Sequence, residues 1–298
     1  MLSKLSIKQK LILIMLIPLF VVILLAAKLA VDSFSSSRNL QSLDKVVILS
    51  IKIGNLVHET QKERGSSAGF LGSSGTKFKD SLPTQRELTN KSIEEFKKTL
   101  EDKFHIPCEV ENDVNCAGLA EYKAGAAAGS KAAVMLTIGT GIGGCILLNG
   151  EVFHGFSNSA CEVGYMHMDD SDFQTLGAAS ILTKKVAAWK GEPAENWSGY
   201  HIFEEAKKGD KICNRAIDEM TDVLGKGIAN ICYVVNPEVV VLGGGIMAQE
   251  AFLKDKIEKA VEKYLVSSMW EHTSIAFAKN QNNAGMLGAF YHFQGRHA

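Results

Sequence analysis

The stretch that decides the fold runs from Glu111 to Gly144 and reads ENDVNCAGLAEYKAGAAAGSKAAVMLTIGTGIGG. It opens with three polar residues, Glu111, Asn112 and Asp113, and the small residues behind them predict a helix over about 115–128. A carboxylate at the start of a helix is favoured because the helix dipole is positive at that end. The sequence therefore predicts that Asp113 stands at a helix N-terminus.

The second half of this stretch is a strand, a glycine-rich loop and another strand. The apolar run Ala132–Ile138 predicts the first strand, and residues 145–148 predict the second. Between them, residues 139–144 would let backbone N–H groups approach a phosphate without Cβ atoms in the way. A carboxylate and a phosphate cradle together are what phosphoryl transfer to a hydroxyl needs. Taken singly, the loop could be a plain hairpin turn and Asp113 a plain helix cap.

The rest of the C-terminal part alternates strands and helices, as an α/β domain does. The run EVVVL at 238–242 is apolar throughout, as in a parallel strand buried on both faces. Residues 243–245 are three glycines that lead into a helix, a junction that suits a nucleotide. The other elements predicted are a strand at 151–154, helices over 201–235 with a break at 209–210, a helix at 250–265, a strand at 273–278 and a helix at 283–293.

The N-terminus differs in composition from everything after it. Residues 11–27 carry no charge and approach the length of a membrane-spanning helix. Lys4, Lys8 and Lys10 precede this run, which predicts an uncleaved anchor over residues 1–31 with the N-terminus inside. A signal peptide is the alternative, but the small-x-small cleavage pattern is missing. Beyond the anchor we expect helices, the clearest over 85–103.

Charge and cysteine content narrow the class of protein. The net charge of the 298 residues is −1, so nothing in the whole chain argues for a nucleic-acid partner. The six cysteines have no CxxC spacing, which favours buried, reduced thiols over a zinc site.

Residues 103–293 resemble the ROK family of sugar kinases and related repressors. Five motifs in the same order carry the resemblance. They are ENDVNCA at 111–117, LTIGTGIGG at 136–144, EVG at 162–164, NPE with LGGGI at 236–238 and 242–246, and NAGMLGA at 283–289.

The resemblance implies an α/β, actin-like ATPase fold of the ribonuclease-H-like type, with ATP and Mg²⁺ as cofactors and a sugar as substrate. It implies that Asp113 is the catalytic base and that the other site residues divide into two groups. The sugar side would be Asn112, Glu162, Tyr165 (where the family usually has His) and Gln174 (where it usually has Glu). The nucleotide side would be Gly139, Thr140 and Gly141 at the phosphates, and Gly243, Gly244 and Gly245 at the adenosine.

Further expectations follow from the comparison with the family pattern. Residues 166–179 contain no cysteine, so we expect neither a structural zinc nor any other metal held by side chains alone. The resemblance also allows a homodimer.

The family's first lobe is incomplete here, because no strand with an Asp-x-Gly-Gly-Thr loop precedes residue 103. Residues 106–110 would be a strand of that lobe, and the kinase would be impaired.

A second resemblance concerns residues 1–100. The segments QKERGSSAGFL at 61–71 and LPTQR at 82–86 resemble the start of a bacterial chemoreceptor with a nitrate- and nitrite-sensing domain. This gives three predicted parts, an anchor (1–31), a helical sensor fragment (32–102) and a kinase-like domain (103–298). The anchor would place the chain in the inner membrane, whereas the kinase-like part alone would be cytoplasmic. The alternative function is a membrane-bound receptor fragment whose ROK-like part only binds. A repressor would need a winged helix-turn-helix, which residues 1–100 do not offer.

Overall fold

The computed structural model describes residues 28, 46–67, 69, 70 and 75–297. These residues form two compact units, one up to Cys108 and the other from Glu109 onward. Each unit is described by itself.

The first unit is an antiparallel pair of helices. One helix covers residues 46–67 and the other, α2, covers Ser81–Phe104. Lys52 Nζ lies 2.6 Å from Glu95 Oε2. Nearer the other end of the pair, Gln85 Nε2 donates to Glu59 Oε2 at 2.7 Å. His105, the residue after α2, caps the helix. Its backbone is left-handed (φ 55°), and its N–H donates to the carbonyl oxygen of Glu101.

The second unit is built on a five-stranded sheet with the order β3-β2-β1-β6-β7. Strands β1, β2 and β3 form an antiparallel meander, whereas β1, β6 and β7 run parallel to one another. A separate antiparallel pair is formed by β4 and β5. The strands are β1 Ala132–Ile138, β2 Ile142–Leu148, β3 Glu151–Val152, β4 His167–Met168, β5 Ser171–Asp172, β6 Val239–Gly243 and β7 Ser274–Phe277.

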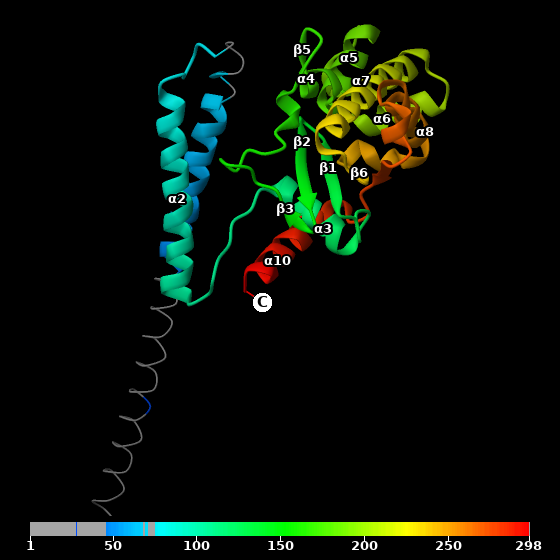
Figure 1. Cartoon of the computed structure of the whole chain (residues 1–298). Coiled ribbons are helices and arrows are strands. Elements are labelled where there is room, and N and C mark those ends of the chain that lie inside the picture. The colour runs from blue at the N-terminus through cyan, green and yellow to red at the C-terminus, as the bar shows by residue number, and fades with distance from the viewer. Residues whose placement is uncertain (1–27, 29–45, 68, 71–74, 298) are drawn as a thin grey trace, which may run out of the picture. The chain divides into compact units, whose positions relative to one another are not determined.

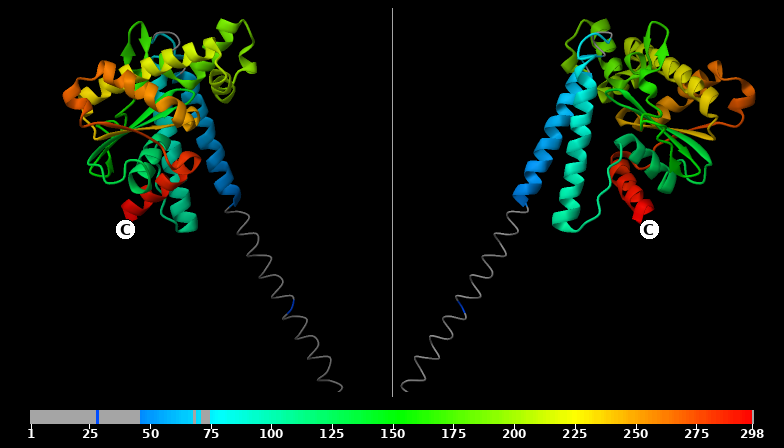
Figure 2. Two further views of the ribbon diagram at one scale, coloured as in Figure 1. Left: turned by 90° about the vertical axis from the view of Figure 1, so that its right-hand side faces the viewer. Right: turned by 60° about the vertical axis from the view of Figure 1, so that its left-hand side comes forward.

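Both faces of the sheet are covered, which Figure 1 shows for the second unit and Figure 2 shows from two other directions. Helices α3 (Asp113–Ala124) and α10 (Ala284–His297) cover one face. The longest helix, α7 (Lys211–Val235), packs with α8 (Glu250–Tyr264) on the other. The remaining helices are α4 Phe173–Gly177, α5 Ala179–Lys190, α6 Gly199–Lys207, α9 Ser267–Trp270 and the short turns η2 Val163–Tyr165, η3 Ala194–Asn196, η4 Gly245–Gln249 and η5 Gln281–Asn283.

The alternation of side chains along a strand explains why the central strands are almost wholly apolar. In β1, Val134 and Leu136 belong to the core under α7 and α8, whereas Ala133 and Met135 belong to the core under α3 and α10. Strand β6 divides its valines in the same way, and all five of its residues are buried. A strand with two buried faces has no position left for a polar side chain.

Helices α3 and α10 approach each other at backbone distance. A Cβ atom on Gly288 of α10 would overlap the carbonyl group of Cys116 in α3. The far end of α3 is fixed by Glu121, whose side chain is fully buried. The Glu121 carboxylate accepts the N–H groups of Ala126 at 2.8 Å, Lys279 at 3.1 Å and Asn280 at 2.8 Å. One carboxylate thus joins the end of α3 to the segment that leads into α10.

The predicted elements of the second unit are largely confirmed. Strand β1 has the predicted bounds, and the helical region 201–235 is interrupted at Gly209 and Asp210, between α6 and α7. The predicted strand at 106–110 was wrong, because these residues form no strand and Ile106 is 55% exposed. An extended segment without a neighbouring strand has no ladder of hydrogen bonds to stabilise it.

The predicted membrane anchor at 11–27 lies outside the described residues. Within the part of the chain that the structure describes, no helix is both long enough and apolar enough to cross a membrane.

We expect Glu121→Ala to lower the free energy of unfolding by about 2–4 kcal/mol, since three backbone N–H groups would lose the acceptor that this fully buried side chain supplies. Urea denaturation followed by circular dichroism measures this change. Glu262→Ala, at an exposed position of α8, is the control and should change stability by less than about 0.5 kcal/mol. An equal, small effect of both substitutions would contradict the role of Glu121.

Candidate active site

The two glycine loops lie side by side because their strands do. Strands β1 and β6 are parallel neighbours with Thr137 opposite Gly243, so both chains leave the sheet at the same edge. Gly244 has a φ of +107°, and a Cβ atom there would overlap the carbonyl group of Ile138. Only glycine fits this position. The sheet therefore brings residues 243–245 against the start of the loop 139–141.

The loop 139–141 is held by its own hydrogen bonds and by helix α5. The Gly139 N–H donates to the carbonyl oxygen of Gly141 at 2.9 Å. Ser180, in the first turn of α5, donates its hydroxyl to the carbonyl oxygen of Thr140 at 2.7 Å. Thr140 itself is exposed. The phosphate-binding role of Gly139, Thr140 and Gly141 stays a prediction, and the N–H of Gly139 is already used inside the loop.

Two cavities lie against these loops. One, of about 320 Å³, is lined by Gly243, Gly244 and Gly245 together with Phe277 and Gln281, among others. The other, of about 400 Å³, is lined by Gly139, Gly245 and Tyr200, among others. Both volumes lie in the range of small-molecule sites. Both cavities thus lie at the residues from which the sequence motifs predict nucleotide contacts.

The predicted base, Asp113, is the first residue of α3 and is exposed. The helix begins there because Asn112 Oδ1 accepts the N–H groups of Val114 at 2.8 Å and Asn115 at 3.2 Å, an N-cap. This first turn packs on the start of β2, where a Cβ atom at Gly143 would lie 2.7 Å from Val114 Cγ2. The turn that carries Asp113 thus packs on β2 just after the glycine loop, and the role of Asp113 as the base stays a prediction. The oxygen of Asn112 is a helix cap, so only its amide nitrogen is left for a substrate.

The other predicted sugar contacts gather on the same loop from a different side. A Cβ atom at Gly144 would lie 2.6 Å from the carbonyl oxygen of Cys161, so the chain just before Glu162 touches β2. A Cβ atom at Gly141 would lie 2.6 Å from Gln174 Oε1. Glu162 and Tyr165 are exposed. Gly141, Gly143 and Gly144 therefore let Gln174, Val114 and Cys161 approach one short segment. Asp113 and Glu162 are the chain neighbours of Val114 and Cys161.

A buried carboxylate at the site was missed by sequence reasoning. The side chain of Glu111 is only 7% exposed, and its Oε2 lies 2.7 Å from His154 Nε2 and 3.4 Å from His292 Nδ1. His154, a lone histidine in the sequence, is thus paired with this carboxylate. Burial alone would raise the pKa of Glu111, but hydrogen bonds from Asn115, His154 and the Asn112 N–H hold it below its ordinary value.

The cysteines near the candidate site are buried thiols. Burial raises the pKa of Cys116 to about 11 and that of Cys161 to about 12. Within the described residues, no three His, Cys, Asp or Glu side chains are grouped so that they could hold a metal ion.

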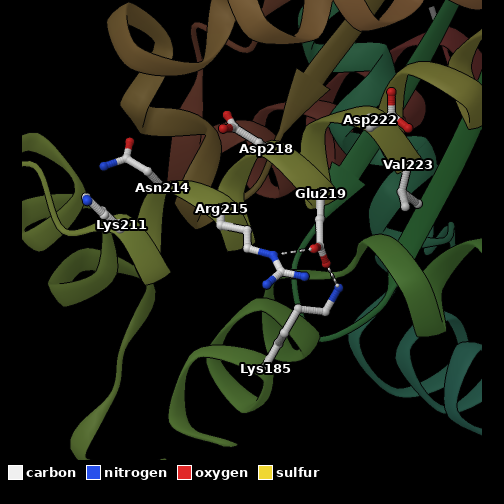
Figure 3. Close-up of a pocket in the computed structure, with 8 residues that line it drawn as sticks. All are labelled: Lys185, Lys211, Asn214, Arg215, Asp218, Glu219, Asp222 and Val223. Atoms are coloured by element: carbon white, nitrogen blue, oxygen red, sulfur yellow. Dashed lines mark hydrogen bonds and ion pairs between the residues drawn. The ribbon is translucent and has the colours of Figure 1, made fainter. Parts of the chain in front are cut away.

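A larger groove lies between α5 and α7 and is shown in Figure 3. Its charges neutralise one another, since Glu219 binds Lys185 and Arg215, each at 3.1 Å. The guanidinium of Arg215 also covers the Trp189 ring, 4.7 Å from its centre. The predicted site residues come from other segments, so this groove is not the candidate active site.

Comparison with known proteins identifies the family of this chain. The ROK family model matches residues 48–296. "Uncharacterized protein CPE0188" from Clostridium perfringens is 43% identical over 82% of this chain and 83% of that protein. The beta-glucoside kinase of Klebsiella pneumoniae is 32% identical over 66% of this chain and 67% of its own length. The ROK hexokinase of Thermus thermophilus is 27% identical, covering 67% of this chain and 70% of that one with a TM-score of 0.61.

The chain belongs to the ROK family, and its structural relatives have the actin-like ATPase fold with a mixed α/β sheet. The family match begins at residue 48, well before residue 103, where the sequence motifs begin. It therefore includes most of the segment 32–102. The comparisons give no support to the chemoreceptor-like interpretation of that segment.

The lowered pKa of Glu111 predicts a pH dependence of stability. A carboxylate whose pKa is lower in the folded state stabilises the fold above its unfolded pKa, near 4.5, and loses this contribution as the pH falls through the folded value. Glu111→Gln should therefore destabilise the protein at about pH 7, and the gap to wild type should narrow towards about pH 3. Urea denaturation at a series of pH values measures it. A gap that stays constant would show that Glu111 makes no ionised contacts in the fold.

Elemental analysis of the purified chain should find no tightly held zinc. The reason is the lack of cysteine in 166–179, together with the lack, among the described residues, of three grouped His, Cys, Asp or Glu side chains. One zinc per chain that survives dialysis against a chelator would refute this prediction.

Proposed function

We propose that the protein transfers the γ-phosphoryl group of ATP to a hydroxyl of a hexose, an amino sugar or a β-glucoside. The observation that carries the proposal is the convergence at the carboxyl edge of the sheet. Two glycine loops adjoin there, and Asp113 stands at the start of a helix packed on the same loop. Sugar-kinase relatives support the substrate class.

In this proposal Asp113 accepts the proton of the attacking hydroxyl. A base within reach of that proton raises the nucleophilicity of the oxygen as the new P–O bond forms. The amide nitrogen of Asn112, Glu162 and Gln174 would hold the other sugar hydroxyls. Gln174 offers an amide where a carboxylate would give a charge-assisted bond, so it holds a hydroxyl more weakly. The exposed ring of Tyr165 would lie beside the sugar.

The nucleotide side would use the remaining N–H groups of 139–141 for the phosphates and residues 243–245 for the adenosine. Bound magnesium would neutralise phosphate charge, and it commonly needs only one or two protein carboxylates beside the phosphate oxygens. The sequence contains no second phosphate loop of the Asp-x-Gly-Gly-Thr kind. Because losing one positioned donor costs about 10²–10³ in rate, we propose that turnover is slow.

The decisive experiment is sugar-dependent ADP release by purified chain, with glucose, N-acetylmannosamine and a β-glucoside offered separately. We expect slow release with one of them and none without sugar. Absence of release with every sugar, together with retained nucleotide binding, would instead indicate a binding protein of the same fold.

Asp113→Asn should reduce that release by about 10²–10⁴-fold, because the amide cannot take the proton. The melting temperature should stay unchanged, since the exposed side chain has no buried partner to lose. Asp218→Asn is the matched control, because Asp218 lies on α7 and pairs with Lys256 at 2.6 Å. Wild-type turnover in the Asp113 variant would exclude it as the base.

A further inference from the structure

The buried carboxylate of Glu111 uses both oxygens, and the two oxygens hold different parts of the site. Oε1 accepts the N–H of Asn112 and the side-chain amide of Asn115, each at 2.8 Å. These bonds fix the turn that leads from Glu111 into the start of α3, where Asp113 lies. Oε2 lies 2.7 Å from His154 Nε2, and His292 Nδ1 of α10 approaches the same oxygen at 3.4 Å.

His154 belongs to the segment that carries Glu162. It follows β3 by two residues, and its carbonyl oxygen accepts the N–H of Ala160 at 3.1 Å, which closes the loop 154–160. Cys161 comes next and rests on Gly144 of β2. The imidazole of His154 therefore links the start of the loop 154–160 to Glu111. The backbone carbonyl of His154 links that start to the end of the loop.

We propose that Glu111 is a positioning residue, and that its bond to His154 sets the distance between the turn bearing Asp113 and the loop bearing Glu162. The inference rests on the proposed function, because those two segments are the sugar side of that site. Bonds to an ionised carboxylate are roughly twice as strong as neutral ones, and little water reaches this one to compete. The link joins segments 43 positions apart in the chain.

The nucleotide side has separate supports. Loop 139–141 is held by Ser180, and residues 243–245 are held by the pairing of β6 with β1. Neither support involves Glu111. Loss of the Glu111–His154 bond should therefore act on the sugar and on the chemical step while leaving the KM for ATP in place.

The kinetic test compares four variants with wild type. Glu111→Gln and His154→Leu remove the charged bond, and each should lower kcat/KM for the sugar by about 10–100-fold, since a misplacement of about 1 Å can cost 10²-fold. The KM for ATP should change by less than about 2-fold. His154→Gln keeps a donor at the end of the side chain and should recover most of the loss. Glu109→Gln is the matched control, because Glu109 makes a similar pair with His297 at 3.3 Å outside this link.

A second measurement does not depend on turnover. Hydrogen exchange followed by mass spectrometry reports on the peptides 109–116 and 153–165 separately. In Glu111→Gln and His154→Leu both peptides should exchange faster than in wild type, whereas Glu109→Gln should leave 153–165 unchanged. Unchanged exchange of 153–165 in Glu111→Gln would overturn the inference, as would an equal rise in the KM values for sugar and ATP.

The two proposals fail in different ways. A wild-type chain with no sugar-dependent turnover refutes the kinase function, and the exchange experiment still decides whether Glu111 couples the two segments. A wild-type chain that turns over, with Glu111→Gln equally active, refutes the positioning role and leaves the kinase function standing.

Discussion

The second unit depends on the burial of β1 between two other strands and two layers of helices. Its hydrogen bonds are taken by β2 on one side and β6 on the other, and its side chains fill both cores. A strand constrained in this way cannot shift by one residue without exposing its apolar side chains. The place where β1 ends is therefore fixed, and so are the loop that follows and everything packed on that loop.

Glycines at the carboxyl end of β1 and β6 and at the start of β2 let other segments approach this end of the sheet closely. At Gly144 and Gly244 a side chain would collide with neighbouring backbone, so the absence of a Cβ atom lets a second segment approach. The chemical groups then come from outside the sheet, Asp113 from the start of α3 and Gln174 from α4. The sheet fixes where the segments meet, and the surrounding helices and loops carry the polar side chains of the candidate site. This division is the usual one in α/β proteins, where ligands bind beyond the carboxyl ends of the strands.

Sequence reasoning succeeded where local pattern and burial agree. Ala132–Ile138 is an apolar run ended by glycine, and it is a strand with those bounds. It failed at residues 106–110, where an apolar run has no neighbouring strand. It also missed the contacts of Glu111 and Glu121, because their partners lie far along the chain, 43 positions away for His154 and 159 for the Asn280 N–H. No local pattern marks such a pair. The roles of Asp113, Glu162 and Gln174 stay predictions, since their proximity is geometry and their chemistry awaits measurement.

The backbone contact between Gly288 and Cys116 has a consequence for how the protein is made. Helix α10 follows every strand of this unit in the chain, yet it covers the face of the sheet on which α3, the first helix of the unit, is packed. Until α10 has been synthesised, that face and the apolar residues of α3 lack this cover. The nascent chain must therefore wait in a partly assembled state, in which exposed apolar surface invites chaperones or aggregation. Folding of this unit is therefore completed only once α10 is available to pack on α3.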